Sequence, residues 1–385
     1  MRSRFSCRAA SLALTIFAGL SLSAGCGGGG GSTPSMNVTF TRIADKSMSE
    51  FAAVDRFDLP SINGAGTAAF QVDVTFTNFL AGAIYKGSGG AVTKIADPTA
   101  GALGGVDDHV TINDAGTVAF HASDVTSIFT GSGGALTLVA NTSQVPGGLA
   151  PIGAPAINAV GAVAFAGTNA AVPPTDTRLF LKSDAGITTL QQTQAGGFAS
   201  LGNVAMNDSG VVAFQGMKTD ASQGVYVRSA AGVVSVIADI NTPGRNGFSF
   251  GNPVINSGGM VALRAIKNSQ VSSQAILVGS GGAPTTVADT TSVASPFVSF
   301  GEPSINDNGS VAFLGLERDG TKGVFVLFPG ASTPVPIVKV GDAMFGSSVV
   351  QLDFGRNALN NANQLAFIYA LQDGSIGIAV ANVQR

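Results

Sequence analysis

The chain has 385 residues, of which 45% are hydrophobic and 11% charged, so it can bury a large core. Its 52 glycines and its three glutamates disfavour long surface helices and favour short strands joined by tight turns. Two cysteines and two histidines, with no pair at zinc-ligand spacing, exclude a disulfide framework and a structural zinc site.

Residues 1–25 have the layout of a secretory signal peptide. A segment that contains Arg2, Arg4 and Arg8 precedes the apolar run SLALTIFAGLSL, which is too short to span a bilayer. After its removal 17 of the 20 basic side chains remain against 23 acidic ones, a net charge of −6. Because no Lys/Arg run is present either, we expect no nucleic acid and no anionic lipid surface as a partner.

The next stretch, LSAGCGGGGGSTPS, resembles the processing site of bacterial lipoproteins, since small residues directly precede Cys26. In that class the cysteine is lipidated and becomes the first residue; Ser23 stands where such sites usually have leucine. The glycine run is a flexible linker, so residues 26–37 are predicted to be a lipidated cysteine and its tether. The resemblance implies anchoring in a bacterial envelope, with Gly27 typical of outer-membrane lipoproteins. The alternative is secretion with Cys26 unmodified.

Residues 38–385 repeat one element, N-x-x-G-x-x-A-F, seven times, as in TINDAGTVAF and SINDNGSVAF. The fifth copy ends in Leu263, which fills a similar core volume to phenylalanine. The seventh copy has Asn363 in place of glycine, and asparagine tolerates positive φ best among the other residues. The motif asparagines are Asn63, Asn113, Asn158, Asn207, Asn256, Asn306 and Asn360.

Each unit contains four strand-like runs, which in the second unit are VTIN, TVAFHA, SIFTG and ALTLVAN. The step from Asn to Gly predicts a turn between the first two strands. Val-Ala-Phe is apolar at consecutive positions, which predicts sheets covered on both faces. Four short antiparallel strands per unit of about 50 residues are typical of a propeller blade. We therefore predict an all-β fold, a seven-bladed β-propeller.

The last unit has three strands, ALNN, QLAFIYA and IGIAVAN, and lacks an outer one. The segment VTFTRIADKS, residues 38–47, resembles outer strands such as KIADP and has no blade of its own. We predict that it becomes the outer strand of blade seven and closes the ring. Before each motif asparagine stands a large aliphatic residue, and one position earlier stands a smaller residue, which suits close packing near the axis.

These repeats resemble those of the bacterial family described as choice-of-anchor tandem repeat NxxGxxAF-containing proteins, over residues 38–385. The resemblance implies an exported, anchored protein. It brings no catalytic residues.

Motifs for chemistry are sparse. There is no G-x-S-x-G elbow and no DxDxDG loop. Asp107, Asp108 and His109 could contribute to a calcium or transition-metal site, but a solvated loop between blades is the favoured interpretation. His121 follows a motif phenylalanine and is expected to be a packed side chain. The GSGG segments follow third strands and predict hairpin turns. We expect no metal and no cofactor.

One position varies from blade to blade while the motif does not. It lies four residues before each motif asparagine, so in a closed ring its seven residues converge at one end of the central channel. Loops between second and third strands, which carry much of the charge and include Asp73 and Asp124, are expected to emerge on the same face. The candidate ligand-binding residues are the five polar ones: His109, Asn203, Asn252, Glu302 and Arg356. The alternative is that such loops are polar because they are wet.

The first function hypothesis is a monomeric, surface-tethered lipoprotein whose propeller binds an extracellular or envelope protein or polysaccharide without catalysis. The second is a hydrolase or lyase that acts on an extracellular polymer at the mouth of the channel. The third is a purely architectural role in the envelope. Propellers host many unrelated functions, so the fold alone does not choose among them.

Overall fold

The computed structural model describes residues 36–76, 79–97, 103, 106, 109–122, 126–169, 176–193 and 197–385. The predicted signal peptide, Cys26 and residues up to 35 lie outside this part, as do Asp107 and Asp108. Residues 36–385 form one compact unit. No helix within the described residues has the length and apolar character needed to cross a membrane.

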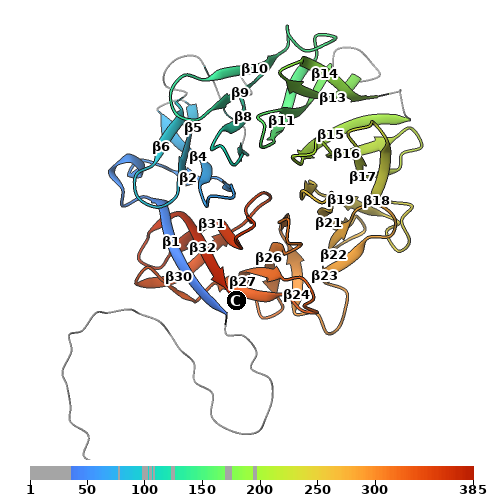
Figure 1. Ribbon diagram of the computed structural model, residues 1–385. Coiled ribbons are helices and arrows are strands. Elements are labelled where there is room, and N and C mark those ends of the chain that lie inside the picture. Colours follow the sequence, from blue (N-terminus) through green and yellow to red (C-terminus); the bar gives the residue numbers. More distant parts are fainter. Residues whose placement is uncertain are drawn as a thin grey trace, which may run out of the picture. The chain divides into compact units, whose positions relative to one another are not determined.

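Seven antiparallel sheets surround a central axis, which confirms the predicted seven-bladed β-propeller (Figure 1). The strands of each blade are given from the axis outward. Blade one consists of β2 (Arg56–Phe57) with β3 (Ser61–Ile62), β4 (Ala68–Phe76), β5 (Phe79–Gly87) and β6 (Thr93–Ala96), and blade two of β7 (Thr111–Ile112), β8 (Val118–Ala122), β9 (Ser127–Gly131) and β10 (Thr137–Asn141). Blade three consists of β11 (Ala150–Ile157), β12 (Val163–Asn169), β13 (Asp176–Ser183) and β14 (Gly186–Gln192). The short 3₁₀ helix η1 (Ser49–Phe51) precedes the first blade.

The next three blades follow the same order. Blade four consists of β15 (Phe198–Met206), β16 (Val212–Lys218), β17 (Gln223–Arg228) and β18 (Val234–Asp239). Blade five consists of β19 (Phe248–Phe250) with β20 (Val254–Ile255), β21 (Val261–Lys267), β22 (Gln270–Gly279) and β23 (Thr285–Asp289). Blade six consists of β24 (Phe297–Phe300) with β25 (Ser304–Ile305), β26 (Val311–Glu317), β27 (Lys322–Leu327) and β28 (Val335–Lys339).

Blade seven joins the two ends of the propeller. It contains β29 (Ala343–Met344), β30 (Ser347–Asp353), β31 (Gln364–Leu371), β32 (Ile376–Gln384) and, outermost, β1 (Asn37–Asp45). Antiparallel pairing runs from Asn37 opposite Gln384 to Asp45 opposite Gly377, so the predicted closure by the N-terminal strand is confirmed. The strand expected at ALNN is only a bridge between Leu359 and Leu365, because β30 supplies most of the inner strand further upstream.

The core is divided among the spaces between neighbouring blades. All five residues of β8 are buried, which agrees with the consecutive apolar pattern of the motif and with sheets covered on both faces. The motif phenylalanines Phe70, Phe120, Phe165, Phe214, Phe313 and Phe367 have no exposed surface. Each packs with aromatic or aliphatic groups of its own sheet and of the preceding blade; Phe313 and Phe325, for example, share one sheet and have ring centroids 6.1 Å apart.

Each motif asparagine holds its own turn, and all but Asn158 also bind the next blade. In its own turn the Asn256 Oδ1 accepts the backbone N–H of Met260 at 2.9 Å. Its Nδ2 donates to the backbone carbonyl of Asn306 in the next blade at 3.1 Å. The same cross-blade bond links Asn63 to Asn113, Asn113 to Asn158, Asn207 to Asn256, Asn306 to Asn360 and, closing the circle, Asn360 to Asn63.

The motif turns need a left-handed residue at the glycine position. Gly116 has φ +76°, and the substituting Asn363 adopts φ +56°, as its residue type predicted. All seven turns lie at one end of the channel, which we call the turn face. The inner strands begin at the opposite end, the mouth face. Asn37 is paired with Gln384 at the turn-face end of β1, and Asp45 lies at the mouth-face end.

Asp45 fastens β1 to blade seven. It has no exposed surface, accepts the Tyr369 hydroxyl at 3.1 Å, and forms an ion pair with Arg42 at 2.9 Å. Arg42 in turn lies over the ring of Phe345, 4.7 Å from its centroid. Burial, with Asp45 as the next cause, raises the pKa of Tyr369, so this hydroxyl stays a hydrogen-bond donor over the physiological range.

We predict that Asn256→Ala lowers the free energy of unfolding by about 2 kcal/mol, because it leaves a buried carbonyl of Asn306 without its donor. Urea unfolding measures the change. Asn268→Ala, at an exposed side chain, is the matched control and should change stability by less than about 0.5 kcal/mol. Equal stability of the two variants would show that the cross-blade bonds contribute nothing.

We also predict that Asp45→Ala destabilises the protein by about 2–3 kcal/mol, since the buried Tyr369 hydroxyl and the Arg42 guanidinium lose their shared acceptor. Asp184→Ala, at an exposed carboxylate, is the control. Hydrogen exchange of the β1 and β32 amides should rise in Asp45→Ala well above that in the control. Unchanged protection of these amides would contradict the assigned role of Asp45.

Candidate functional site

Aliphatic side chains form a collar around the channel axis between the two faces. They are the residues directly before the motif asparagines. Ile62, Ile112, Ile157, Ile255, Ile305 and Leu359 line a hollow of about 180 Å³ near the turn face and another of about 160 Å³ that Met206 also lines. Because the collar is apolar, polar contacts to a ligand on the axis have to form at one of its two ends.

We call the residues four positions before the motif asparagines the mouth residues. They lie where the inner strands break or bulge. Leu59, Asn252 and Glu302 fall in the gaps between β2 and β3, β19 and β20, and β24 and β25. Ala154 and Asn203 fall where the register of β11 and of β15 shifts against the next strand. Such irregularities turn a side chain out of the ladder. They explain why this position can vary while the strand around it repeats.

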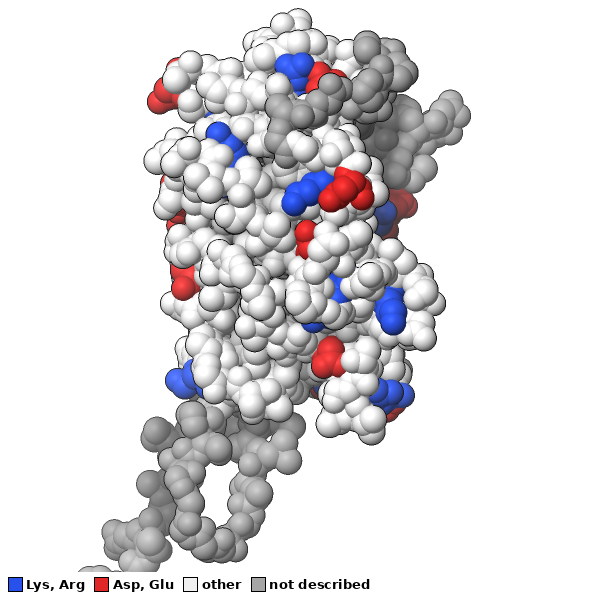
Figure 2. Space-filling model, turned by 90° about the vertical axis from the view of Figure 1, so that its right-hand side faces the viewer, with Lys and Arg blue, Asp and Glu red and all other residues white. Residues whose placement is uncertain are grey.

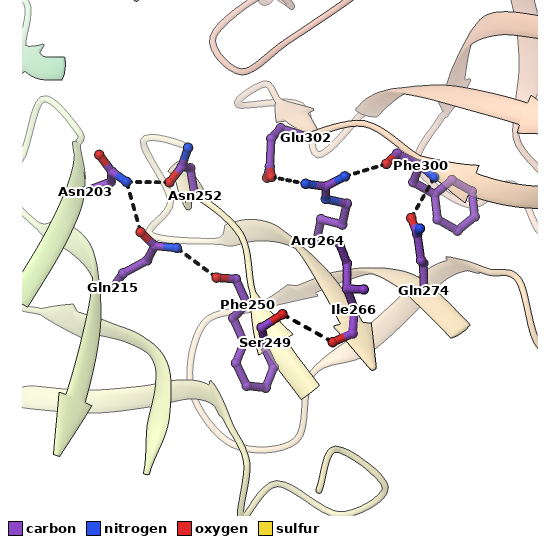
Figure 3. A network of polar contacts seen from close by, with 10 residues as sticks. All are labelled: Asn203, Gln215, Ser249, Phe250, Asn252, Arg264, Ile266, Gln274, Phe300 and Glu302. Atoms are coloured by element: carbon purple, nitrogen blue, oxygen red, sulfur yellow. Dashed lines mark hydrogen bonds and ion pairs between the residues drawn. The ribbon is translucent and has the colours of Figure 1, made fainter. Parts of the chain in front are cut away.

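The structure brings the predicted residues into one circle. Asn203 Nδ2 donates to Asn252 Oδ1 at 2.7 Å across neighbouring blades (Figure 3). The carboxylate of Glu302 lies so close to Gly251 that a Cβ there would stand 2.5 Å from it, so only glycine allows this approach. A Cβ at Gly355 would likewise stand 2.9 Å from Leu59, which brings blades seven and one together beside Arg356.

A second variable position supports this circle, and it was not among the residues predicted from the sequence. It directly follows the last motif residue. Gln215 accepts from Asn203 at 3.0 Å and donates to the Phe250 carbonyl of the next blade at 2.7 Å (Figure 3). Arg264 donates to Glu302 at 2.9 Å and to the Phe300 carbonyl at 2.8 Å. The variation of this second position from blade to blade is the sequence signal that could have revealed it.

Charged side chains at the mouth face are largely paired. Asp73, expected in a loop, is instead buried within β4, where it binds Arg56 at 2.7 Å. Its strand is longer than expected because β4 and β5 pair as far as Phe76 and Phe79. Lys322 binds Asp353 at 2.9 Å. Asp124, expected in the same set of loops, lies outside the described residues.

Charge over the side of the molecule is sparse and mixed. Figure 2 shows basic and acidic side chains scattered singly or in small groups of both signs over this side, with no patch of one sign. His121 is buried, as expected of a packed side chain. Phe248, Phe250, Phe297 and Phe300 are at most 8% exposed and therefore serve as core. Within the described ranges no group of histidine, cysteine and acidic side chains is placed to hold a metal ion.

A cavity of about 590 Å³ opens beside the circle, between blades six, seven and one. Glu302, Arg264 and Leu59 line it from the side of the channel. Half-buried aliphatic side chains form much of its remaining wall: Leu314, Ile368, Ala370 and Ile376. Asp55, Arg56 and Asp353 are charged groups of its lining. A cavity of this size with an apolar wall and few converging polar groups suits a small ligand or one segment of a larger one.

Three titratable groups of the mouth are shifted by burial. The pKa of Arg356 falls to about 10, and Glu302 opposes that fall. Burial raises the pKa of Glu302, while Arg264 and then Arg356 hold it down. Burial, and secondarily the charge of Arg356, holds the pKa of His109 well below its usual range, so the imidazole is neutral. Arg356 therefore acts electrostatically on both Glu302 and His109.

The fold and this mouth define the chain as a seven-bladed β-propeller with a variable polar circle at one end of its channel. The chain belongs to a family of unknown function (DUF7453), whose model matches residues 29–384. No curated protein matches the sequence.

Solved structures show the same fold at low identity. A prolyl endopeptidase studied for the role of inter-domain dynamics in catalysis and specificity superposes with TM-score 0.52 at 13% identity. The superposition covers 86% of this chain and 50% of the endopeptidase. The acylaminoacyl peptidase of Pyrococcus horikoshii gives 0.53 at 11% identity, over 50% of its length and 83% of this chain. This chain thus spans half the length of these peptidases, and the likeness concerns the propeller fold.

We predict that acidification destabilises the folded protein through His109. Because its pKa is lower in the folded than in the unfolded chain, stability is complete above about pH 6.5 and falls as the unfolded chain takes up the proton. Between pH 7.5 and 5.5 the loss from this one group is at most about 1.4 kcal/mol. Urea unfolding of His109→Gln should show a loss smaller by that amount; an identical pH profile for both proteins would refute the prediction.

Proposed function

We propose that the protein is a surface-tethered bacterial lipoprotein whose propeller binds an extracellular or envelope macromolecule at the mouth face, without catalysis. The partner is a protein or polysaccharide, and the propeller acts as a monomer. The supporting observation is the contrast between the two ends of the inner strands. The turn face repeats one asparagine in every blade, whereas the mouth face carries different side chains that converge beside a cavity of about 590 Å³.

The tether in this proposal rests on the sequence before residue 36: the signal peptide, Cys26 and the glycine run. The resemblance to the choice-of-anchor repeat family supports the same assignment. The chain enters the propeller at Asn37, at the turn-face end of β1. The described propeller therefore begins at the end of β1 that lies away from the mouth face.

Site-specific photo-crosslinking in the producing cells tests the proposed face. A benzoylphenylalanine replaces Gln351, an exposed residue of the cavity lining, and in a second protein it replaces Val160, which is 83% exposed in a motif turn. We expect a discrete adduct from position 351 and none from position 160, because only the mouth face meets the partner. Adducts of equal yield from both positions, or none from position 351, would contradict the proposal.

A further inference from the structure

Arg356 is the one guanidinium in the circle of mouth residues, and it is buried without a partner. Its residue is 8% exposed, and within the described part of the chain it makes no hydrogen bond or ion pair. The other cations around the cavity are paired: Arg56 with Asp73, Arg264 with Glu302 and Lys322 with Asp353. Arg356 senses the charge of Glu302, but that carboxylate already binds Arg264.

A largely buried guanidinium without a protein partner loses much of its hydration and gains no hydrogen bond in return, while the nitrogens of Arg356 still reach solvent and hence a ligand. Among the described residues Arg356 carries a positive charge that no ion pair compensates, because Arg264 and Glu302 pair with each other and His109 is neutral. The Nε2 of His109 is buried and also lacks a hydrogen-bond partner. Both groups can be satisfied together by one oxyanion that carries a single negative charge.

The cavity beside Arg356 indicates what the anion is attached to. Arg356 and His109 do not line this cavity themselves; Glu302, whose charge acts on Arg356, lines it, as does Leu59, which lies against Gly355. Leu314, Ile368 and Ile376 give it an aliphatic wall. An aliphatic group of the ligand would exclude water from this wall while the anion stays at Arg356.

We propose that the mouth captures the free carboxylate of a peptide C-terminus at Arg356 and His109, with the peptide's last, aliphatic side chain in the adjoining cavity. This inference rests on the proposed function and names the partner's chemistry. A guanidinium holds a carboxylate through two parallel hydrogen bonds, which is the geometry that a C-terminus offers. A doubly charged phosphate fits less well, because Glu302 lies close to the same position and repels it.

The aliphatic wall also favours a peptide over an acidic sugar. Sugars stack on exposed aromatic faces, but the aromatic residues Phe57 and Phe354 of this cavity are each 3% exposed. The chain contains no tryptophan.

Calorimetry on the full chain with three small probes tests the inference. The probes are N-acetylleucine, its neutral amide N-acetylleucinamide, and glucuronate, a sugar carboxylate without the aliphatic group. We expect N-acetylleucine to bind in the millimolar range and the other two about ten- to a hundredfold more weakly. Arg356→Gln should weaken N-acetylleucine by a similar factor, whereas Lys267→Gln, which removes a cation at the end of β21, should not. Urea unfolding verifies that both variants are folded.

His109 gives a second readout by NMR, as one of only two histidines in the chain. Burial is the main cause of the low pKa of His109 and the charge of Arg356 is the second; a carboxylate on Arg356 cancels this second cause, so saturation with N-acetylleucine should raise that pKa. Equal binding of acid and amide, no binding of N-acetylleucine, preference for glucuronate, or unchanged affinity in Arg356→Gln would each overturn the inference. If crosslinks from position 351 persist in such a case, the proposed function stands and the peptide assignment alone fails.

Discussion

The carboxamide of the motif asparagine is the interaction on which the propeller depends. One oxygen fixes the turn within a blade, and one nitrogen reaches the same turn of the next blade. Apolar packing between sheets is not directional and tolerates sliding, whereas a buried hydrogen bond of about 3 Å sets distance and orientation together. Asn360 reaches back to Asn63, and between blades three and four Asp208 accepts from the backbone N–H of Ala159, so each blade takes its position relative to the axis from its neighbour.

This arrangement separates what must repeat from what can differ. The turn face carries the repeated bonds, and the collar of isoleucines keeps the blades equidistant from the axis. At the mouth face the inner strands break. The scaffold positions Asn203, Glu302 and Arg356 there, but these residues do not form the repeated bonds between blades that the motif asparagines form at the turn face. Hydrogen bonds from Gln215 and Arg264 to the next blade add local support there. Substitutions at the mouth residues can therefore accumulate without changing how the seven blades are joined.

The fold was predictable because the information is present seven times: turn chemistry, buried second strands and the unpaired outer strand at 38–47 all indicate the same closed ring. Contacts between blades were less predictable. The donor role of Asn256 toward Asn306, and of Arg264 toward Glu302, depends on how two blades are offset, which no single repeat specifies. The burial of Asp73 was missed because β4 extends beyond the motif. The convergence of the mouth residues followed from their fixed spacing to the motif, but their ligand did not.

The pairing of β1 with β32 also determines how the propeller responds to a mechanical load. Hydrogen bonds between antiparallel strands lie perpendicular to the strands, so a pull along β1 from the chain before Asn37 loads the eight paired positions together, in shear. Asp45, at the far end of the strand from the point of pull, is loaded through the whole ladder. A propeller that is pulled by its first strand therefore resists opening residue by residue.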